Sequence, residues 1–309
     1  MKIRQNEFFI GAARFAAVGI LALGLPLCVQ AQDTNLSFSA LQAAADKGDP
    51  VAQLELAADY AHGTGVPQDY AKAADYLRRA AEQGNTEAEM ALGSYYGRGR
   101  GVPKNMGLAI QWYRKAADQG NAVAQFAMGN FYATGRGVIN DMLQAIQWWQ
   151  KAAAQNQIDA QTVLGELFLI PKPPYGTNYL NYAEAVRWLR PAADAGSISA
   201  MNNLGVAYEN GYGVTSDLAQ AAKWYRQAAE MGNANAQANL GLLYMTGQGV
   251  PMDLVQAYKW FKLSSIQNSA LGTHHCEEME SNQSLKPEQL AQAEQMVRDF
   301  LSQQRQKSM

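Results

Sequence analysis

Two short segments carry side chains that could support chemistry. Residues 274–278 read His-His-Cys-Glu-Glu, all metal-ligand types, and residues 97–101 read Gly-Arg-Gly-Arg-Gly, a composition found in phosphate-binding loops. Neighbouring residues of a helix point about 100° apart, so the first run is not expected to converge on one ion, and we interpret it as a polar linker. No predicted strand precedes the glycine run, and similar turns recur along the chain, as is typical of a structural turn. The sequence therefore predicts neither a metal site nor a phosphate site.

The remaining composition argues against catalysis and nucleic-acid binding. The sequence has three histidines, and no grouping of Ser, His and acid emerges around them. Its two cysteines, Cys28 and Cys276, are too few for a disulfide framework or a cysteine-based zinc site. With 25 basic and 27 acidic residues, the chain lacks the positive charge expected of a nucleic-acid binder. We predict a non-enzymatic protein with no cofactor and no nucleic-acid partner.

Residues 1–31 have the pattern of a secretory signal peptide. Three basic residues lead into an apolar run over residues 15–25, and Val-Gln-Ala at 29–31 supplies a cleavage site after Ala31. The run is shorter than the roughly 20 residues that a membrane-spanning helix needs, which disfavours a permanent anchor. A lipoprotein attached through Cys28 is a further alternative, disfavoured by the bulky Leu27 before it. We expect a periplasmic or secreted protein without stable membrane insertion of the mature chain.

An internal repeat dominates the rest of the sequence. One aromatic position recurs at intervals of 36, 36, 40, 36 and 36 residues, at Tyr76, Trp112, Trp148, Trp188, Trp224 and Trp260. A fixed period of this size is the signature of stacked supersecondary repeats. The predicted repeats span residues 49–84, 85–120, 121–156, 157–196, 197–232 and 233–268. We expect the recurring tryptophan to fill the core between neighbouring repeats.

Each repeat is predicted to contain two helices separated by a glycine turn. In the third repeat, Asn121 caps a helix that runs to about Ala133, and Asp141 caps a second helix. That second helix ends at Asn156, the residue type that best replaces glycine in the left-handed conformation closing a helix. The chain is therefore predicted to be an all-α solenoid of about six helix-pair repeats.

The recurring motifs resemble those of the Sel-1-like repeat family, relatives of tetratricopeptide-repeat solenoids. They are Leu-Gly-x-x-Tyr, Gly-x-Gly-Val, Ala-x-x-Trp and Ala-Ala-x-x-Gly-Asn. The last repeat carries the first three, at Leu240-Gly241, Tyr244, Gly247–Val250, Ala257 and Trp260. The resemblance implies a right-handed α-solenoid that scaffolds protein complexes, often in the bacterial envelope. Some cysteine-rich members are linked to β-lactam binding or hydrolysis, but the cysteine pairs of their repeats are absent here.

The segments that flank the repeats are predicted to close the ends of the array. Residues 32–48 contain a half-repeat, because residues 41–48 match the end of a second helix. Residues 269–309 are predicted to form a linker followed by a capping helix that begins at Pro287. Both caps are expected because a terminal repeat otherwise exposes an apolar face.

The candidate partner-binding surface lies on the first helix of each repeat. Counted from Ala52 as position one, positions one, five and nine form the repeating core, and positions three and seven fall on the opposite side of the helical wheel. First helices are expected to line the concave side of a solenoid, so these positions predict a groove for a protein or peptide. The candidate residues are Met90, Phe126, Asn130, Glu166 and Asn202. Phe126 is either an exposed anchor or packed against the next helix.

The fourth repeat contains a second candidate site. Its turn, residues 170–179, is four residues longer than the others and lacks Gly-x-Gly-Val. Prolines stiffen this loop, and Tyr175 and Tyr179 could contact a partner, although a neutral insertion is the alternative. The sequence as a whole predicts an exported adaptor that binds a protein. The alternatives are an envelope assembly or regulatory factor in polysaccharide export, secretion or a motor complex and, less favoured, a β-lactamase-like hydrolase.

Overall fold

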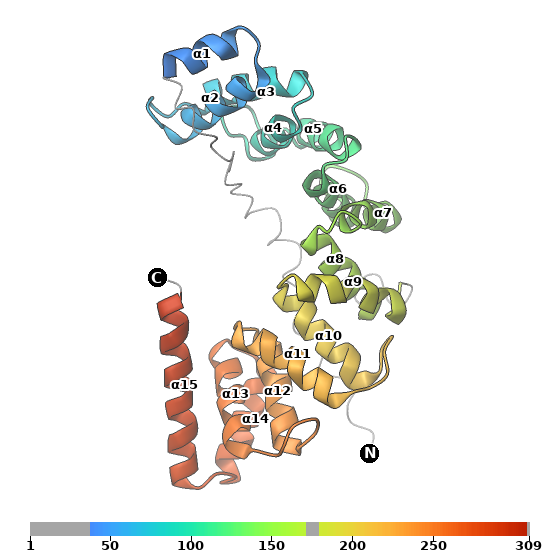
Figure 1. Cartoon of the computed structure of the whole chain (residues 1–309), viewed down its shortest axis with the longest axis vertical. Helices are drawn as coiled ribbons and strands as arrows, with labels where there is room; N and C mark the ends of the chain where they lie inside the picture. Colours follow the sequence, from blue (N-terminus) through green and yellow to red (C-terminus); the bar gives the residue numbers. More distant parts are fainter. Residues whose placement is uncertain (1–37, 171–178, 308–309) are drawn as a thin grey trace. The chain divides into compact units, whose positions relative to one another are not determined.

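The structure, a computed structural model, describes residues 38–170 and 179–307. These two ranges contain fifteen α-helices and no strand (Figure 1). The all-α repeat fold predicted from the sequence is therefore confirmed. The predicted signal peptide and residues 171–178 of the long loop lie outside the described residues. No described helix is both long and apolar enough to cross a membrane.

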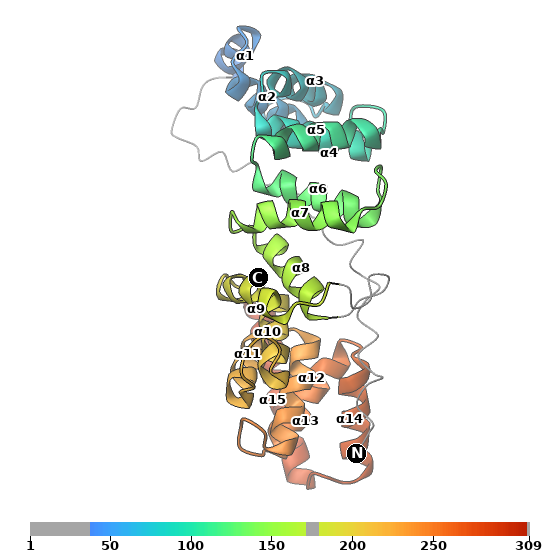
Figure 2. The same cartoon turned by 90° about the vertical axis from the view of Figure 1, so that its right-hand side faces the viewer.

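The chain divides into two compact units, Met1–Gln157 and Ile158–Met309, which we describe separately. In the first unit, helix hairpins stack one after another, so that each second helix packs against the next first helix (Figure 2). Its helices are α1 (Phe38–Asp46), α2 (Pro50–His62), α3 (Tyr70–Glu82), α4 (Thr86–Arg98), α5 (Met106–Asp118), α6 (Ala122–Thr134) and α7 (Met142–Ala153).

The second unit continues the same alternation of first and second helices. Its helices are α8 (Ile158–Leu169), α9 (Tyr182–Asp194), α10 (Ile198–Asn210), α11 (Leu218–Glu230), α12 (Ala234–Thr246), α13 (Leu254–Ile266), α14 (Ala270–Ser281) and α15 (Pro287–Lys307). Helices α8, α10 and α12 each pack against the second helix that follows, and both α14 and α15 pack against α13. In addition, α8 contacts α10 and α12 contacts α14, so first helices of successive hairpins touch one another here.

Local capping chemistry sets the helix boundaries. Asn121 accepts a hydrogen bond from the Ala124 N–H over 3.0 Å, and Asp141 accepts one from the Gln144 N–H over 3.0 Å. Each bond satisfies one of the backbone donors left unpaired at a helix N-terminus. Asn156 has a φ of 63°, the left-handed conformation that the sequence predicts for it.

In the second to sixth repeats, the core of the hairpin forms where a glycine of the first helix meets a large side chain of the second helix. A Cβ at Gly129 would overlap the Trp149 ring, so only glycine permits this approach. The large residue is the one that follows the recurring aromatic position, and it is 0–6% exposed at Tyr113, Trp149, Leu189, Tyr225 and Phe261.

The recurring tryptophan is predicted to fill the core between neighbouring repeats, and Trp112 and Trp148 do pack against the repeat before them, but not every ring is buried. Trp112, Trp188 and Trp224 are only half-buried, although Trp148 and Trp260 are buried. The large core residue that directly follows each tryptophan faces the first helix of its hairpin. Consecutive helical residues point about 100° apart, so the tryptophan itself lies at the edge of the hairpin. Cations cover the rings from outside: Lys115 lies 4.0 Å from the Trp112 centroid and Lys151 lies 4.3 Å from that of Trp148.

The Gly-x-Gly-Val turn fixes the spacing between successive hairpins. Gly101, its second glycine in the second repeat, lies against the backbone carbonyl of Tyr70 at the start of α3. A Cβ at Gly101 would overlap that carbonyl, and the φ of Gly101 is +66°. Gly213 meets the Tyr182 carbonyl in the same way in the second unit. The glycine run over residues 97–101 is therefore part of a structural turn, as predicted.

The ends of the array differ partly from expectation. Helix α1 covers the first hairpin with buried Leu41 and Ala45, as the half-repeat predicts. At the other end, α15 begins at Pro287, as predicted, and packs against α13. The predicted polar linker after residue 268 is wrong, because residues 270–281 form α14, a first helix placed one period after α12.

Candidate partner-binding surface

The predicted exposure of position three on the first helices is wrong for most repeats. Met90 is 6% exposed and belongs to a core cluster with Ile110 and Phe131. Asn202 is 9% exposed and lies on α10, which contacts α8. A first helix packs against its own second helix and against neighbouring helices, so its apolar contacts extend over more than one face. Leu54, Thr162 and Ala238 at the same position are buried as well.

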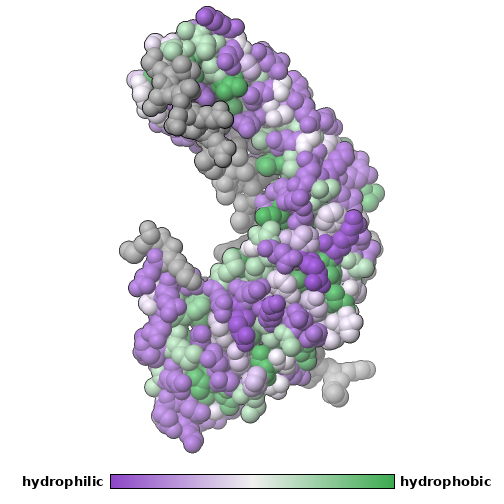
Figure 3. Space-filling model, in the orientation of Figure 1, coloured by the Kyte–Doolittle hydropathy of each residue, from purple (hydrophilic) through white to green (hydrophobic). Residues whose placement is uncertain are grey.

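Phe126 and Asn130 of α6 remain partly accessible. Both side chains are half-buried. Asn130 accepts a hydrogen bond from the Trp149 Nε1–H over 3.1 Å, so its carbonyl oxygen orients that core ring. The structure thus gives Asn130 an internal role, whereas the half-buried Phe126 ring keeps surface that a partner could contact. The described residues visible in Figure 3 are mainly hydrophilic, with scattered hydrophobic patches.

A line of polar side chains crosses three first helices of the second unit. Asn239 of α12 donates to the Asn202 Oδ1 over 3.4 Å, and Asn202 of α10 donates to the Asn203 Oδ1 over 3.4 Å. Asn203 then donates to the Glu166 Oε1 of α8 over 3.2 Å. We call these four residues the amide line. Glu166, Asn202 and Asn203 are 5–9% exposed, and Asn239 is half-buried.

The amide line contains two of the predicted site residues, Glu166 and Asn202, and two that the sequence reasoning missed. Asn203 is 37 residues after Glu166, and Asn239 is 37 residues after Asn202. Polar residues about one period apart on otherwise apolar helices were the signal that could have revealed them. Tyr179 is half-buried at the start of the second described range, and Tyr175 lies outside the described residues.

Comparison with known proteins identifies the repeat. The family model for the Sel1 repeat matches residues 50–85, 86–121, 122–157, 158–197, 198–233 and 234–269. The chain belongs to the Sel1 repeat family. Each matched repeat begins one residue after the start predicted from the sequence. Sel1 repeat proteins are generally protein-interaction scaffolds rather than enzymes.

Two solved structures share the fold. A Sel1 repeat protein from Oxalobacter formigenes is 30% identical over 80% of this chain and 96% of its own, with a TM-score of 0.64. The protein c5321, a protective antigen of uropathogenic Escherichia coli, is 29% identical over 86% of this chain, with a TM-score of 0.58. The present chain spans 63% of the length of c5321. No match was found among curated proteins.

Arginine–tyrosine hydrogen bonds join successive Sel1 repeats on the outside of this core. Arg114 donates to the Tyr132 hydroxyl over 2.6 Å, and Arg190 donates to that of Tyr208 over 2.7 Å. In each case the arginine belongs to a second helix and the tyrosine to the next first helix. These contacts set the orientation of neighbouring repeats, and the same surface offers cations beside aromatic rings.

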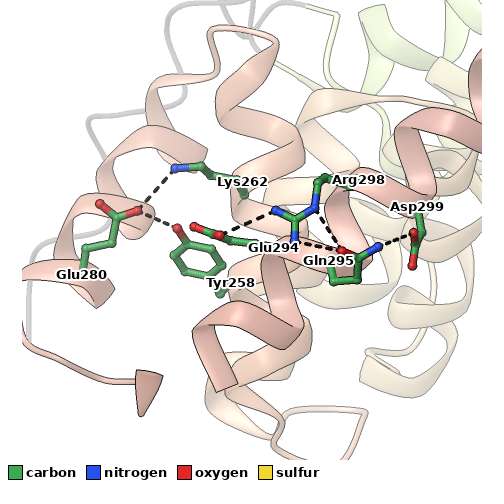
Figure 4. Close-up of polar contacts among 7 residues, drawn as sticks. All are labelled: Tyr258, Lys262, Glu280, Glu294, Gln295, Arg298 and Asp299. Carbon is green, nitrogen blue, oxygen red and sulfur yellow. Dashed lines mark hydrogen bonds and ion pairs between the residues drawn. The ribbon is translucent and has the colours of Figure 1, made fainter. Parts of the chain in front are cut away.

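The last helices carry a separate polar cluster. Glu280 of α14 accepts a hydrogen bond from the Tyr258 hydroxyl over 2.6 Å and lies 3.3 Å from the Lys262 Nζ (Figure 4). The bond from Tyr258 lowers the pKa of Glu280 below its usual value, and burial raises the pKa of Tyr258. Arg298, on α15, pairs with Glu294 over 3.7 Å. The two contacts of Glu280 hold α14 on α13, whereas the pair between Arg298 and Glu294 lies within α15.

Proposed function

We propose that this Sel1 repeat protein is an exported adaptor that binds a protein partner through its first helices. Its membership of a family of interaction scaffolds supports the binding function. The signal-peptide pattern of residues 1–31 supports export. The similar protein c5321 is a protective antigen, which also favours an exported location for the present chain.

The amide line is the observation that supports this binding mode most directly. Its three hydrogen bonds are 3.2–3.4 Å long, at or beyond the upper end of the usual range for N–H···O bonds. Each asparagine side chain offers two N–H donors and a carbonyl acceptor, the groups that a peptide main chain also presents. An extended segment of a partner could therefore exchange these weak internal bonds for shorter ones.

The ligand that fits the amide line is an extended peptide recognised largely through its backbone. Buried polar groups that exchange one hydrogen bond for another avoid a desolvation cost, so binding depends on geometry more than on apolar area. In the first unit, Phe126 is proposed as an apolar contact, because a half-buried aromatic ring can gain burial on association.

Site-specific photo-crosslinking in the native host tests this proposal. A photoreactive amino acid replaces Leu242, which is half-buried and lies three residues after Asn239 on the same face of α12. The matched control carries the same group at Lys223, an exposed position of α11. We expect a protein adduct from position 242, absent from position 223, that weakens when Asn202→Ala and Asn239→Ala are introduced.

The crosslinking results test the role of the amide line separately from binding through the first helices. A specific adduct at position 242 that is indifferent to both asparagine substitutions would refute the role of the amide line. Failure to form any protein adduct at position 242, with the chain folded and present in the exported fraction, would refute binding through the first helices.

A further inference from the structure

Helix α14 brings three metal-ligand side chains onto one face. The ligand atoms of His274, His275 and Glu278 all lie within 4.8 Å of one another. On a helix with 100° between residues, His275 lies 100° from His274, and Glu278 lies 40° from His274 and so between the two imidazoles. Cys276, which points away from this face, is 3% exposed. Cys276 therefore diverges from the histidines, as predicted for adjacent residues, whereas the two histidines and Glu278 share one face of the helix.

Contacts with the core restrict the orientation of the second imidazole. The His275 ring stacks on the Phe261 ring at a centroid distance of 4.8 Å, and its side chain is 14% exposed. Its Nδ1 lies 3.0 Å from the Glu278 Oε2. A ligand held in place before metal arrives loses little conformational entropy on binding.

The other two ligands leave the site open to solvent. His274 is exposed, and its ring centroid lies 5.1 Å from that of His275. The Glu278 side chain is 47% exposed. An ion can thus approach from water and keep water molecules in its remaining coordination positions.

We propose that His274, His275 and Glu278 form a binding site for one divalent transition-metal ion of the Zn²⁺, Ni²⁺ and Cu²⁺ class. Two imidazole nitrogens and one carboxylate oxygen suit these ions, whereas Ca²⁺ and Mg²⁺ prefer oxygen ligands alone. The ion would replace the hydrogen bond between His275 and Glu278 with bonds from both groups to the metal. It would also link two positions about one turn apart and so stabilise α14, the last first helix of the array.

Metal titration of the untagged full chain tests the site. Isothermal titration with Ni²⁺ and Zn²⁺ is expected to show one ion per chain. We expect His274→Ala and Glu278→Gln each to weaken binding by at least about tenfold, since even loss of an outer-shell partner typically costs that much. His62→Ala removes the one remaining histidine of the sequence and is expected to bind as the wild type does. Cys276→Ser is likewise expected to bind the metal as the wild type does, because the Cys276 thiol is not one of the proposed ligands.

Two measurements distinguish loss of ligands from loss of structure. Circular dichroism checks that each variant keeps its helices, and a thermal scan with and without Ni²⁺ measures stabilisation by the ion. We expect Ni²⁺ to raise the midpoint of the wild type and of His62→Ala but not of Glu278→Gln. Absence of binding to the wild type, or wild-type affinity in both ligand variants, would overturn the proposal.

Discussion

At the scale of single residues, a large buried side chain on the second helix is a main packing contact of a hairpin. Leu189 is fully buried over Gly165, in the place that aromatic residues take in four of the other repeats. Leu189→Ala is expected to destabilise the second unit by about 2–5 kcal/mol, because it removes buried methyl groups and leaves a cavity. Met252→Ala, at a residue of the same unit that is 68% exposed, is expected to change stability by about 0.5 kcal/mol or less. Urea unfolding followed by helicity measures both, and equal effects would contradict the assigned core.

Tyr225 links residue chemistry to the pH dependence of stability. Its side chain is fully buried, and its hydroxyl donates to the Glu209 Oε2 over 2.7 Å. Burial, followed by the charge of Glu209, raises the pKa of Tyr225 well above its ordinary value. The folded state therefore keeps the proton at a pH where the unfolded chain releases it. Stability is fully present below the unfolded pKa of about 10 and falls as the pH rises above it, by up to about 1.4 kcal/mol per pH unit for this group.

The variant Tyr225→Phe isolates that contribution. We expect it to be less stable than the wild type at pH 8, because it loses a hydrogen bond worth about 1 kcal/mol. Between pH 10 and pH 11 its stability should fall less steeply, because it has no proton to lose at this position. Denaturant midpoints measured at these pH values give both quantities. Parallel pH profiles for the two proteins would show that Tyr225 ionises equally in both states.

At the scale of helices and turns, the Gly-x-Gly-Val motif sets the distance between hairpins. Gly65 and Gly101 occupy the same motif position with φ values of +72° and +66°. A Cβ at Gly65 meets nothing within 4 Å, whereas one at Gly101 meets the Tyr70 backbone. Gly65→Ala is expected to cost about 1–2 kcal/mol for the left-handed conformation alone. Gly101→Ala adds an overlap typically worth a further 1–3 kcal/mol, which gives a total loss of about 2–5 kcal/mol. Thermal unfolding of the two variants checks the difference, and identical losses would exclude an inter-repeat role.

The elements of the repeats could be predicted because local signals and the period agree. Asn121, Asp141 and Asn156 mark helix ends by side-chain chemistry that needs no tertiary neighbour. Helix α14 was missed because the Leu-Gly-x-x-Tyr motif lapses there, although the cap at Ser269 lies 36 residues after the cap at Asn233. The burial of Met90 could not be predicted from a helical wheel, because it depends on neighbouring helices.

The candidate site, too, could be predicted only in part from the sequence. Glu166 and Asn202 could be selected as polar residues on apolar helices, but their hydrogen bonds run through Asn203, which the wheel assigns to another face. The metal-ligand cluster on α14 was excluded by considering adjacent residues alone. Glu278, one turn later, changes that conclusion, because residues four apart lie on the same face of a helix.

At the scale of the whole molecule, each end of the repeat array needs a capping element, because a terminal hairpin has no neighbour to cover its apolar face. At the C-terminal end, α15 supplies that cover. Ala293 and Val297 are buried, and the Phe300 ring packs edge-on against Trp260 at 5.7 Å. The Lys259 Nζ lies 4.1 Å from the Trp260 centroid and completes the enclosure of that ring. Helix α15 is thus part of the folding unit rather than an appendage.

Truncation of the chain tests this closing role. A chain that ends at Ser284 lacks α15, exposes Trp260 and should melt at least about 5 °C lower, given about 2–4 °C per kcal/mol in domains of comparable size. A chain that ends at Gln304 keeps the buried contacts of α15 and its hydrogen bond to the Glu230 carbonyl, and should melt as the full chain does. Acrylamide quenching of tryptophan fluorescence should increase only in the shorter protein, because Trp260 is 4% exposed when α15 is present. Unchanged melting and quenching after removal of α15 would mean that α13 and α14 close the array by themselves.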